Sequence, residues 1–138
     1  MTVPELEAFL RQEFPQAFSS GDIQIESADG TSSLLRQVYN ERMLRPGGTV
    51  SGPTLMALAD FAMYVVLLSA IGPVHLAVTT SLNINFLRKG QPGQDIVAAA
   101  KLMKLGKRLA VGEVILLSGT SPDPIAHVTS TYSIPNIG

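Results

Sequence analysis

The sequence predicts an α+β fold in which an antiparallel β-sheet wraps around one long central α-helix. An almost unbroken apolar run, Leu55–Ile71, is too long for a buried strand and is typical of a buried helix. After this run the hydrophobic period changes from that of a helix to strict alternation, which is typical of half-buried strands. Both features fit one domain over residues 1–138.

The first expected element is a short helix over residues 4–18. Its apolar residues recur at helical spacing: Leu6, Phe9, Leu10 and Phe14. Two strands are then expected within residues 22–30 and 32–39, joined by a turn at Asp29 and Gly30, which are residue types that favour turns.

The central helix is expected from about Pro53 to Ala70. It follows a loop rich in glycine and proline, with Ser51 or Gly52 as the N-cap, and Pro53 is tolerated in the first turn because its missing N–H costs little there. Asp60 is the only charged residue of this helix. An unpaired buried charge is costly, so Asp60 needs a partner, access to water or a chemical role.

Four strands, expected to form a meander, follow the helix. In the first, residues 75–87, the two faces differ sharply. One face carries Leu76, Val78, Leu82, Ile84 and Phe86, and the other carries Ala77, Thr79, Ser81, Asn83 and Asn85. Three further strands are expected within residues 95–106, 107–119 and 125–135. Such a sheet covers only part of the helix, so we expect a second copy of the chain to cover the rest.

The composition excludes several classes of function. A formal net charge of −1 argues against a general nucleic-acid binder, and the absence of cysteine rules out thiol catalysis and disulfides. No metal site is expected, because His75 and His127 are distant from each other. The acidic N-terminus is unlike a signal peptide, and Asp60 interrupts the apolar run, so we expect a cytoplasmic protein without a membrane span.

The segment Ser51-Gly-Pro-Thr-Leu-Met-Ala-Leu-Ala-Asp60 resembles the signature of the hotdog-fold acyl-CoA thioesterases, specifically the PaaI-like group of the 4-hydroxybenzoyl-CoA thioesterase-type superfamily. That signature is a His-Gly-Gly loop entering the central helix, followed by Leu-Ala-Asp. Here Ser51 stands at the histidine, Gly52 and Pro53 at the two glycines, and Asp60 at the catalytic aspartate. The resemblance covers about residues 20–135.

The resemblance implies hydrolysis of an acyl-CoA to a carboxylic acid and free CoA, without a metal or redox cofactor. Asp60 would act as nucleophile or general base, the Gly52 N–H would bind the oxyanion, and Thr79 would hold the attacking water. Thr80, on the opposite strand face, would take the place of Thr79 if the register differed by one. The family assembles as dimers or dimers of dimers, with the glycine and the aspartate on different subunits.

Further residues are expected to contact substrate. Met56 and Tyr64 lie one helical turn from Asp60, and Ser51 and Pro53 replace family residues in the loop. Arg45 stands where many relatives carry asparagine, which suits a carboxylate or phosphate of the substrate, or a salt bridge to a neighbouring loop. Arg88 and Lys89 begin a basic stretch that ends at Arg108 and that suits either the phosphates of CoA or a solvated sheet edge.

Two other functions remain open from the sequence. The substitutions at Ser51, Pro53 and Arg45 are compatible with a hotdog protein that binds acyl-CoA without hydrolysing it. A hydroxyacyl-thioester dehydratase is also possible on this fold, although its loop would carry a catalytic histidine that is absent here. The acyl group, the choice between nucleophilic and general-base chemistry, and the tetramer arrangement are not determined.

Overall fold

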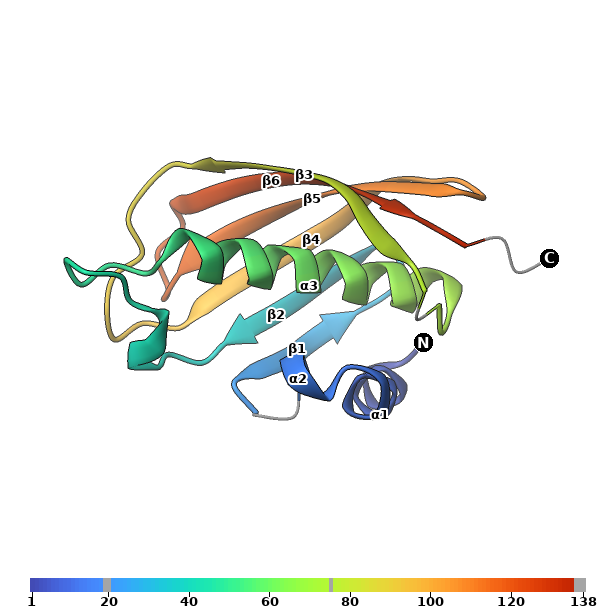
Figure 1. Cartoon of the computed structure of the whole chain (residues 1–138), viewed down its shortest axis with the longest axis horizontal. Helices are drawn as coiled ribbons and strands as arrows, with labels where there is room; N and C mark the ends of the chain where they lie inside the picture. The colour runs from blue at the N-terminus through green and yellow to red at the C-terminus, as the bar shows by residue number, and fades with distance from the viewer. Residues whose placement is uncertain (19–20, 75, 136–138) are drawn as a thin grey trace.

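The computed structural model describes residues 1–18, 21–74 and 76–135. Over these residues the chain forms a six-stranded antiparallel sheet that curves around the long helix α3, Gly52–Ile71 (Figure 1). The strands are β1 Ile23–Ala28, β2 Ser32–Gln37, β3 Val78–Phe86, β4 Ile96–Leu105, β5 Leu109–Ser118 and β6 Pro124–Ser133, and a 3₁₀ turn covers Glu41–Met43. The predicted α+β architecture is confirmed.

The predicted N-terminal helix over residues 4–18 is wrong in one respect, because it is two helices: α1, Val3–Glu13, and α2, Pro15–Phe18. Proline lacks an N–H and disfavours helical geometry in the preceding residue. Phe14 accordingly has φ −138° and ψ 54°. The break places Phe14 between the two helices in the chain, with its ring against Phe61 and Tyr64 of α3.

Helix α3 begins where the sequence predicts. Ser51 is its N-cap and accepts a hydrogen bond from the Thr54 N–H at 3.3 Å, and Gly72, with φ 88°, ends it. With a mean hydropathy of 2.0 over its most apolar 18 residues, the helix is long and apolar enough to cross a membrane, yet 67% of that stretch is buried inside the fold. Packing in the core therefore accounts for its apolarity.

The predicted four-strand meander is wrong in one pairing. Strands β4, β5 and β6 form a meander, but β3 pairs with β6, and the strand order is β1-β2-β4-β5-β6-β3. The chain therefore passes from one edge of the sheet to its middle between β3 and β4 (Figure 1). This pairing places Thr79 directly opposite Tyr132.

The two predicted faces of β3 hold for part of the strand. Leu82 and Ile84 pack against the core as expected, whereas Val78 and Phe86 are 56% and 53% exposed in the single chain. The register with β6 shifts between Thr79 and Ser81, as in a β-bulge. The shift turns Thr79 toward α3, on the face of Leu82, instead of the polar face on which strict alternation put it.

Candidate active site

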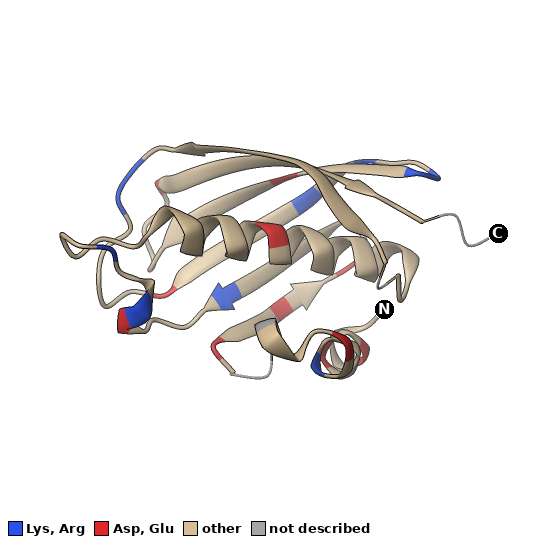
Figure 2. Cartoon of the chain, viewed as in Figure 1, with Lys and Arg blue, Asp and Glu red and all other residues tan. Residues whose placement is uncertain are grey.

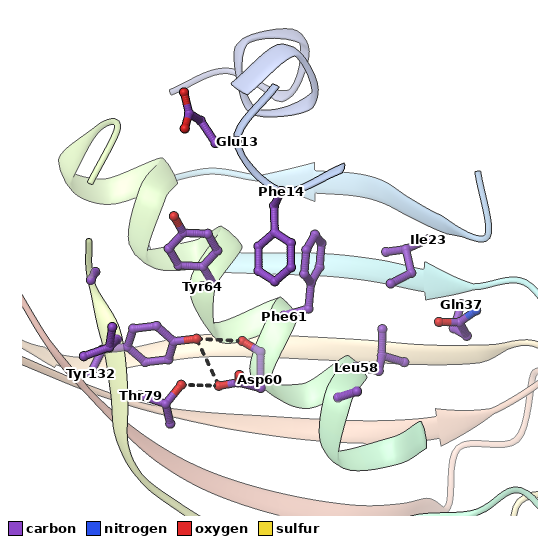
Figure 3. Close-up of a pocket in the computed structure, with 13 residues that line it drawn as sticks. Glu13, Phe14, Ile23, Gln37, Leu58, Asp60, Phe61, Tyr64, Thr79 and Tyr132 are labelled. Atoms are coloured by element: carbon purple, nitrogen blue, oxygen red, sulfur yellow. Dashed lines mark hydrogen bonds between the residues drawn. The ribbon is translucent and has the colours of Figure 1, made fainter. Parts of the chain in front are cut away.

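Asp60 lies half-buried in the middle of α3 and faces β3 and β6. The Thr79 hydroxyl donates a hydrogen bond to Asp60 Oδ1 at 2.6 Å (Figure 3). The Tyr132 hydroxyl lies 3.0 Å from the same oxygen and 3.2 Å from the main-chain carbonyl oxygen of Asp60. Among the described residues, no hydrogen bond to Oδ2 is found. The carboxylate is therefore held through one oxygen, and the other is available for chemistry.

Tyr132 is a site residue that the sequence analysis missed. It is only 3% exposed, and burial, together with the nearby Asp60 charge, raises the pKa of its phenol far above the usual range. Tyr132 therefore stays a neutral hydrogen-bond donor at physiological pH. The signal in the sequence was weak: Tyr132 is one of several alternating inward positions of β6, and only its pairing with Thr79 places it beside Asp60.

A cavity of about 490 Å³ opens beside this carboxylate (Figure 3). It is lined by Glu13, Phe14, Ile23, Gln37, Ala57, Leu58, Asp60, Phe61, Tyr64, Ala77, Val78, Thr79 and Tyr132. Most of these side chains are apolar, and Glu13 and Gln37 add polar groups from α1 and β2. Burial raises the pKa of Tyr64, with a smaller contribution from Glu13. The cavity can accept an apolar group next to a reactive carboxylate.

The structure brings three of the predicted site residues together: Asp60, Thr79 and Tyr64 all line this cavity. Met56 lies outside it, 41% exposed on α3. Gly52 is at the start of α3, and at ~1.5 Å of rise per residue ~12 Å of helix separates it from Asp60. Within one chain, the Gly52 N–H and the Asp60 carboxylate are therefore too far apart to act on the same carbonyl group.

The remaining predicted contacts lie near the start of α3. The side chain of Ser51 caps the helix, and Pro53 lies in its first turn. Arg45 is exposed, and no ion pair is found for it among the described residues, so the salt bridge considered from the sequence is absent there. Arg88 donates a hydrogen bond to the Pro124 carbonyl oxygen at 2.8 Å.

The basic stretch from Arg88 to Arg108 is divided between two ends of the molecule. Arg88 and Lys89 follow β3 and lie at the end where α3 begins, whereas Lys107 and Arg108 lie at the tip of the β4–β5 hairpin at the opposite end (Figure 2). Arg88 and Lys89 line a second hollow of about 440 Å³. One continuous basic rim, as the sequence suggested, is therefore not formed within one chain.

His127 does not line the cavity. His127 Nε2 lies 3.1 Å from Glu113 Oε2, and both residues alternate with inward-facing neighbours of β5 and β6, so this pair is on the sheet face turned away from α3. His75 lies outside the described residues. Among the residues that are described, no group of three or more His, Cys, Asp or Glu side chains is placed to hold a metal ion.

Comparison with known proteins places this geometry in a family. Residues 47–124, more than half of the chain, match the family model described as Thioesterase superfamily. The chain belongs to the thioesterase superfamily. A protein of Saccharolobus solfataricus that is provisionally named an esterase agrees with this assignment, being 30% identical over 88% of this chain and 78% of its own length.

Solved structures of the superfamily share the fold. A protein of Silicibacter sp. TM1040, provisionally named a thioesterase, is 42% identical, covers 99% of this chain and 93% of its own, and superposes with a TM-score of 0.90. E. coli PaaI, from the phenylacetic acid degradation operon, is 23% identical with a TM-score of 0.78, over 93% of this chain and 94% of its own. The fold is therefore the hotdog fold, which this chain shares with PaaI.

One of the fold neighbours carries a ligand. A Streptococcus pneumoniae TIGR4 protein, solved with coenzyme A, is 18% identical with a TM-score of 0.82, covering 92% of this chain and 97% of its own.

Proposed function

We propose that the chain hydrolyses an acyl-CoA thioester to a carboxylic acid and free CoA. The observation that carries the proposal is the Asp60 carboxylate, held through Oδ1 by two hydroxyl groups at an apolar cavity, in a member of the thioesterase superfamily. Coenzyme A bound to a neighbour of the same fold supports a CoA ester as the substrate.

Asp60 Oδ2 is the reacting oxygen in this proposal. As a general base it takes a proton from water, whose oxygen attacks the thioester carbonyl carbon; the tetrahedral intermediate then expels the CoA thiolate, which is protonated as it leaves. As a nucleophile, Oδ2 attacks that carbon itself and the CoA thiolate is expelled and protonated, which leaves an anhydride between Asp60 and the acyl group; water then hydrolyses this anhydride to the carboxylic acid and regenerates the Asp60 carboxylate. The Thr79 proton is already donated to Asp60, so Thr79 can hold a water molecule only through its oxygen lone pairs.

The oxyanion donor is assigned to Gly52 of a second copy of the chain. Gly52 and Asp60 of one chain are too far apart, as described above, so a complete site needs two chains. Among the described residues, no hydrogen-bond acceptor is found for the Gly52 N–H, and Pro53 has no backbone N–H. The exposed apolar side chains along β3, at the edge of the sheet, supply a surface for the second copy.

The acyl group is proposed to be neutral and apolar. Two carboxylates, Asp60 and Glu13, line the cavity, and the described lining contains no lysine or arginine. An acidic acyl chain would therefore meet repulsion without a compensating cation. Arg45, which raised the option of an acidic acyl group, lies beyond the cavity near the start of α3, where it and Arg88 and Lys89 suit the phosphates of CoA.

Binding of acyl-CoA without hydrolysis is the second candidate, because Ser51 and Pro53 depart from the family loop. A dehydratase is less well supported, since its catalytic histidine has no counterpart in the described lining of the cavity. The chain is proposed to work without a metal or redox cofactor and, given its residue usage, in the cytoplasm.

Thiol release from a panel of acyl-CoA esters (phenylacetyl, benzoyl, short and medium aliphatic) tests the proposal with wild type and Asp60→Asn. Asparagine keeps the Oδ1 acceptor for both hydroxyl groups but loses the charge, so the variant should fold while kcat falls by about 100-fold or more. Glu113→Gln, a half-buried carboxylate on the other face of the sheet, is the matched control and should retain wild-type turnover.

Three results distinguish the candidates. Turnover that depends on Asp60 supports the thioesterase. Absence of turnover, combined with thermal stabilisation by acyl-CoA, supports the binding protein. Turnover that is unchanged in Asp60→Asn contradicts the assignment of Asp60 and moves the chemistry elsewhere.

A further inference from the structure

Phe14 occupies an unusual position for a large aromatic side chain. It follows α1, which is anchored by the fully buried Leu6 and Leu10, and by the Met1 amino group, which donates a hydrogen bond to the Ser69 carbonyl oxygen at 3.0 Å. Pro15 then ends the helix. The result is that the Phe14 ring is held over α3 by a well-anchored segment (Figure 3).

The ring of Phe14 is the outer member of an aromatic wall. It meets Phe61 and Tyr64 edge-on, at centroid distances of 5.9 and 6.5 Å. Behind this contact, Phe18 stacks on Phe61 at 6.1 Å, and the Arg11 guanidinium lies 5.4 Å above the Phe18 ring. Phe61 and Tyr64 are almost fully buried, whereas Phe14 is 40% exposed, so one side of its ring faces the cavity and another faces solvent.

The cavity therefore has two functionally different ends. Thr79 and Tyr132 mark the end at which Asp60 is held, and Phe14 lies on the side where α1 joins α2 (Figure 3). An acyl chain whose thioester carbonyl is at Asp60 extends away from the two hydroxyl groups and along the aromatic wall. Phe14 is the partly exposed ring of this wall, on the side of the cavity away from Thr79 and Tyr132.

We infer that Phe14 sets the longest acyl group that the cavity accepts, which makes it a specificity-determining residue. The inference rests on the proposed function, because its first test measures hydrolysis of acyl-CoA esters. Each methylene beyond the limit would have to displace an aromatic ring, and one methylene in an apolar pocket changes specificity by about 10-fold or more. Truncating Phe14 opens this side of the cavity to solvent, and enlarging it shortens the cavity.

The test compares kcat/KM over a series of saturated acyl-CoA esters from butyryl to palmitoyl. We expect Phe14→Ala to move the optimum toward longer chains, with at least a 10-fold gain for the esters just beyond the wild-type limit, and Phe14→Trp to move it toward shorter ones. Phe14→Leu should lie between wild type and Phe14→Ala, and it provides the answer if complete truncation disturbs folding. Phe9→Ala removes a ring of α1 that does not line the cavity, so it should keep the wild-type profile.

The outcomes separate the two proposals. If wild type hydrolyses acyl-CoA but the three Phe14 variants share its chain-length profile, the inference about Phe14 is wrong and the proposed function stands. If wild type hydrolyses none of these saturated esters and neither of the aryl esters of the earlier panel (phenylacetyl and benzoyl), the thioesterase proposal fails. Thermal stabilisation by the same series of esters then tests whether Phe14 limits the length of the acyl group that binds. A chain-length profile of stabilisation that shifts in Phe14→Ala supports this role of Phe14, and an unshifted profile overturns it.

Discussion

Removing the phenol hydroxyl of Tyr132 should impair turnover by releasing the Asp60 carboxylate. Tyr132→Phe keeps the buried ring, which stacks on Tyr64 at 6.0 Å, and removes contacts of 3.0 and 3.2 Å to Asp60. A hydrogen bond to a charged group contributes ~1.5–3 kcal/mol, and water cannot easily replace this one because Tyr132 is buried. If that energy orients the reacting carboxylate, kcat falls by about 10- to 100-fold, at ~1.4 kcal/mol per tenfold.

The assay is steady-state thiol release together with a thermal melt. Because the hydroxyl contacts the carboxylate, the change should fall on kcat while KM stays within about twofold. Tyr39→Phe, which removes a phenol hydroxyl outside the cavity, is the control and should behave as wild type. A native melting temperature with unchanged kcat in Tyr132→Phe would refute the reasoning, and a raised KM at unchanged kcat would mean that the phenol contacts substrate instead.

Three other predictions concern packing, pH and assembly. Gly112→Ala should lower stability by about 1–3 kcal/mol in chemical denaturation, because its Cβ would lie 2.8 Å from the Lys101 carbonyl oxygen; wild-type stability would contradict this close packing. Hydrogen bonds from the backbone N–H groups of Thr31 and Ser32 lower the pKa of Asp29 from 3.8 to about 2. The contribution of Asp29 to stability is therefore present above pH 3.8 and is lost as the pH falls toward 2. In acid unfolding, Asp29→Asn should accordingly lose less stability than wild type over that pH interval. An identical dependence of stability on pH in both proteins would contradict the hydrogen bonds assigned to the Asp29 carboxylate. Leu76→Lys places a charge beside the exposed edge strand and outside the cavity lining, and it should yield monomers with little activity in sedimentation and thiol-release measurements, whereas an active dimer would place the interface elsewhere.

Locally encoded features were predictable from the sequence. The apolar run and its Gly-Pro-rich entry predicted α3 nearly to its observed ends, since helix period and capping depend on residues a few positions apart. Asp60 stood out because a carboxylate is costly inside such a run. The strand segments were also found, although their ends differ from the prediction by one to a few residues. These features were enough to indicate the fold and one reactive group.

The surroundings of Asp60 depend on contacts between distant parts of the chain. Tyr132 is 72 positions from Asp60, and it meets the carboxylate only because β3 pairs with β6 instead of β4. The shift of register at Thr79 likewise comes from that pairing, and strict alternation placed this residue on the wrong face. Phe14 reaches the cavity because Pro15 breaks the helix, whereas the hydrophobic periodicity predicted one continuous helix there. Periodicity shows which side of an element is buried, whereas strand order and the packing of one element on another determine which residues become its neighbours. The sequence therefore predicted the helix and its carboxylate. It did not predict the two hydroxyl groups or the aromatic wall around them.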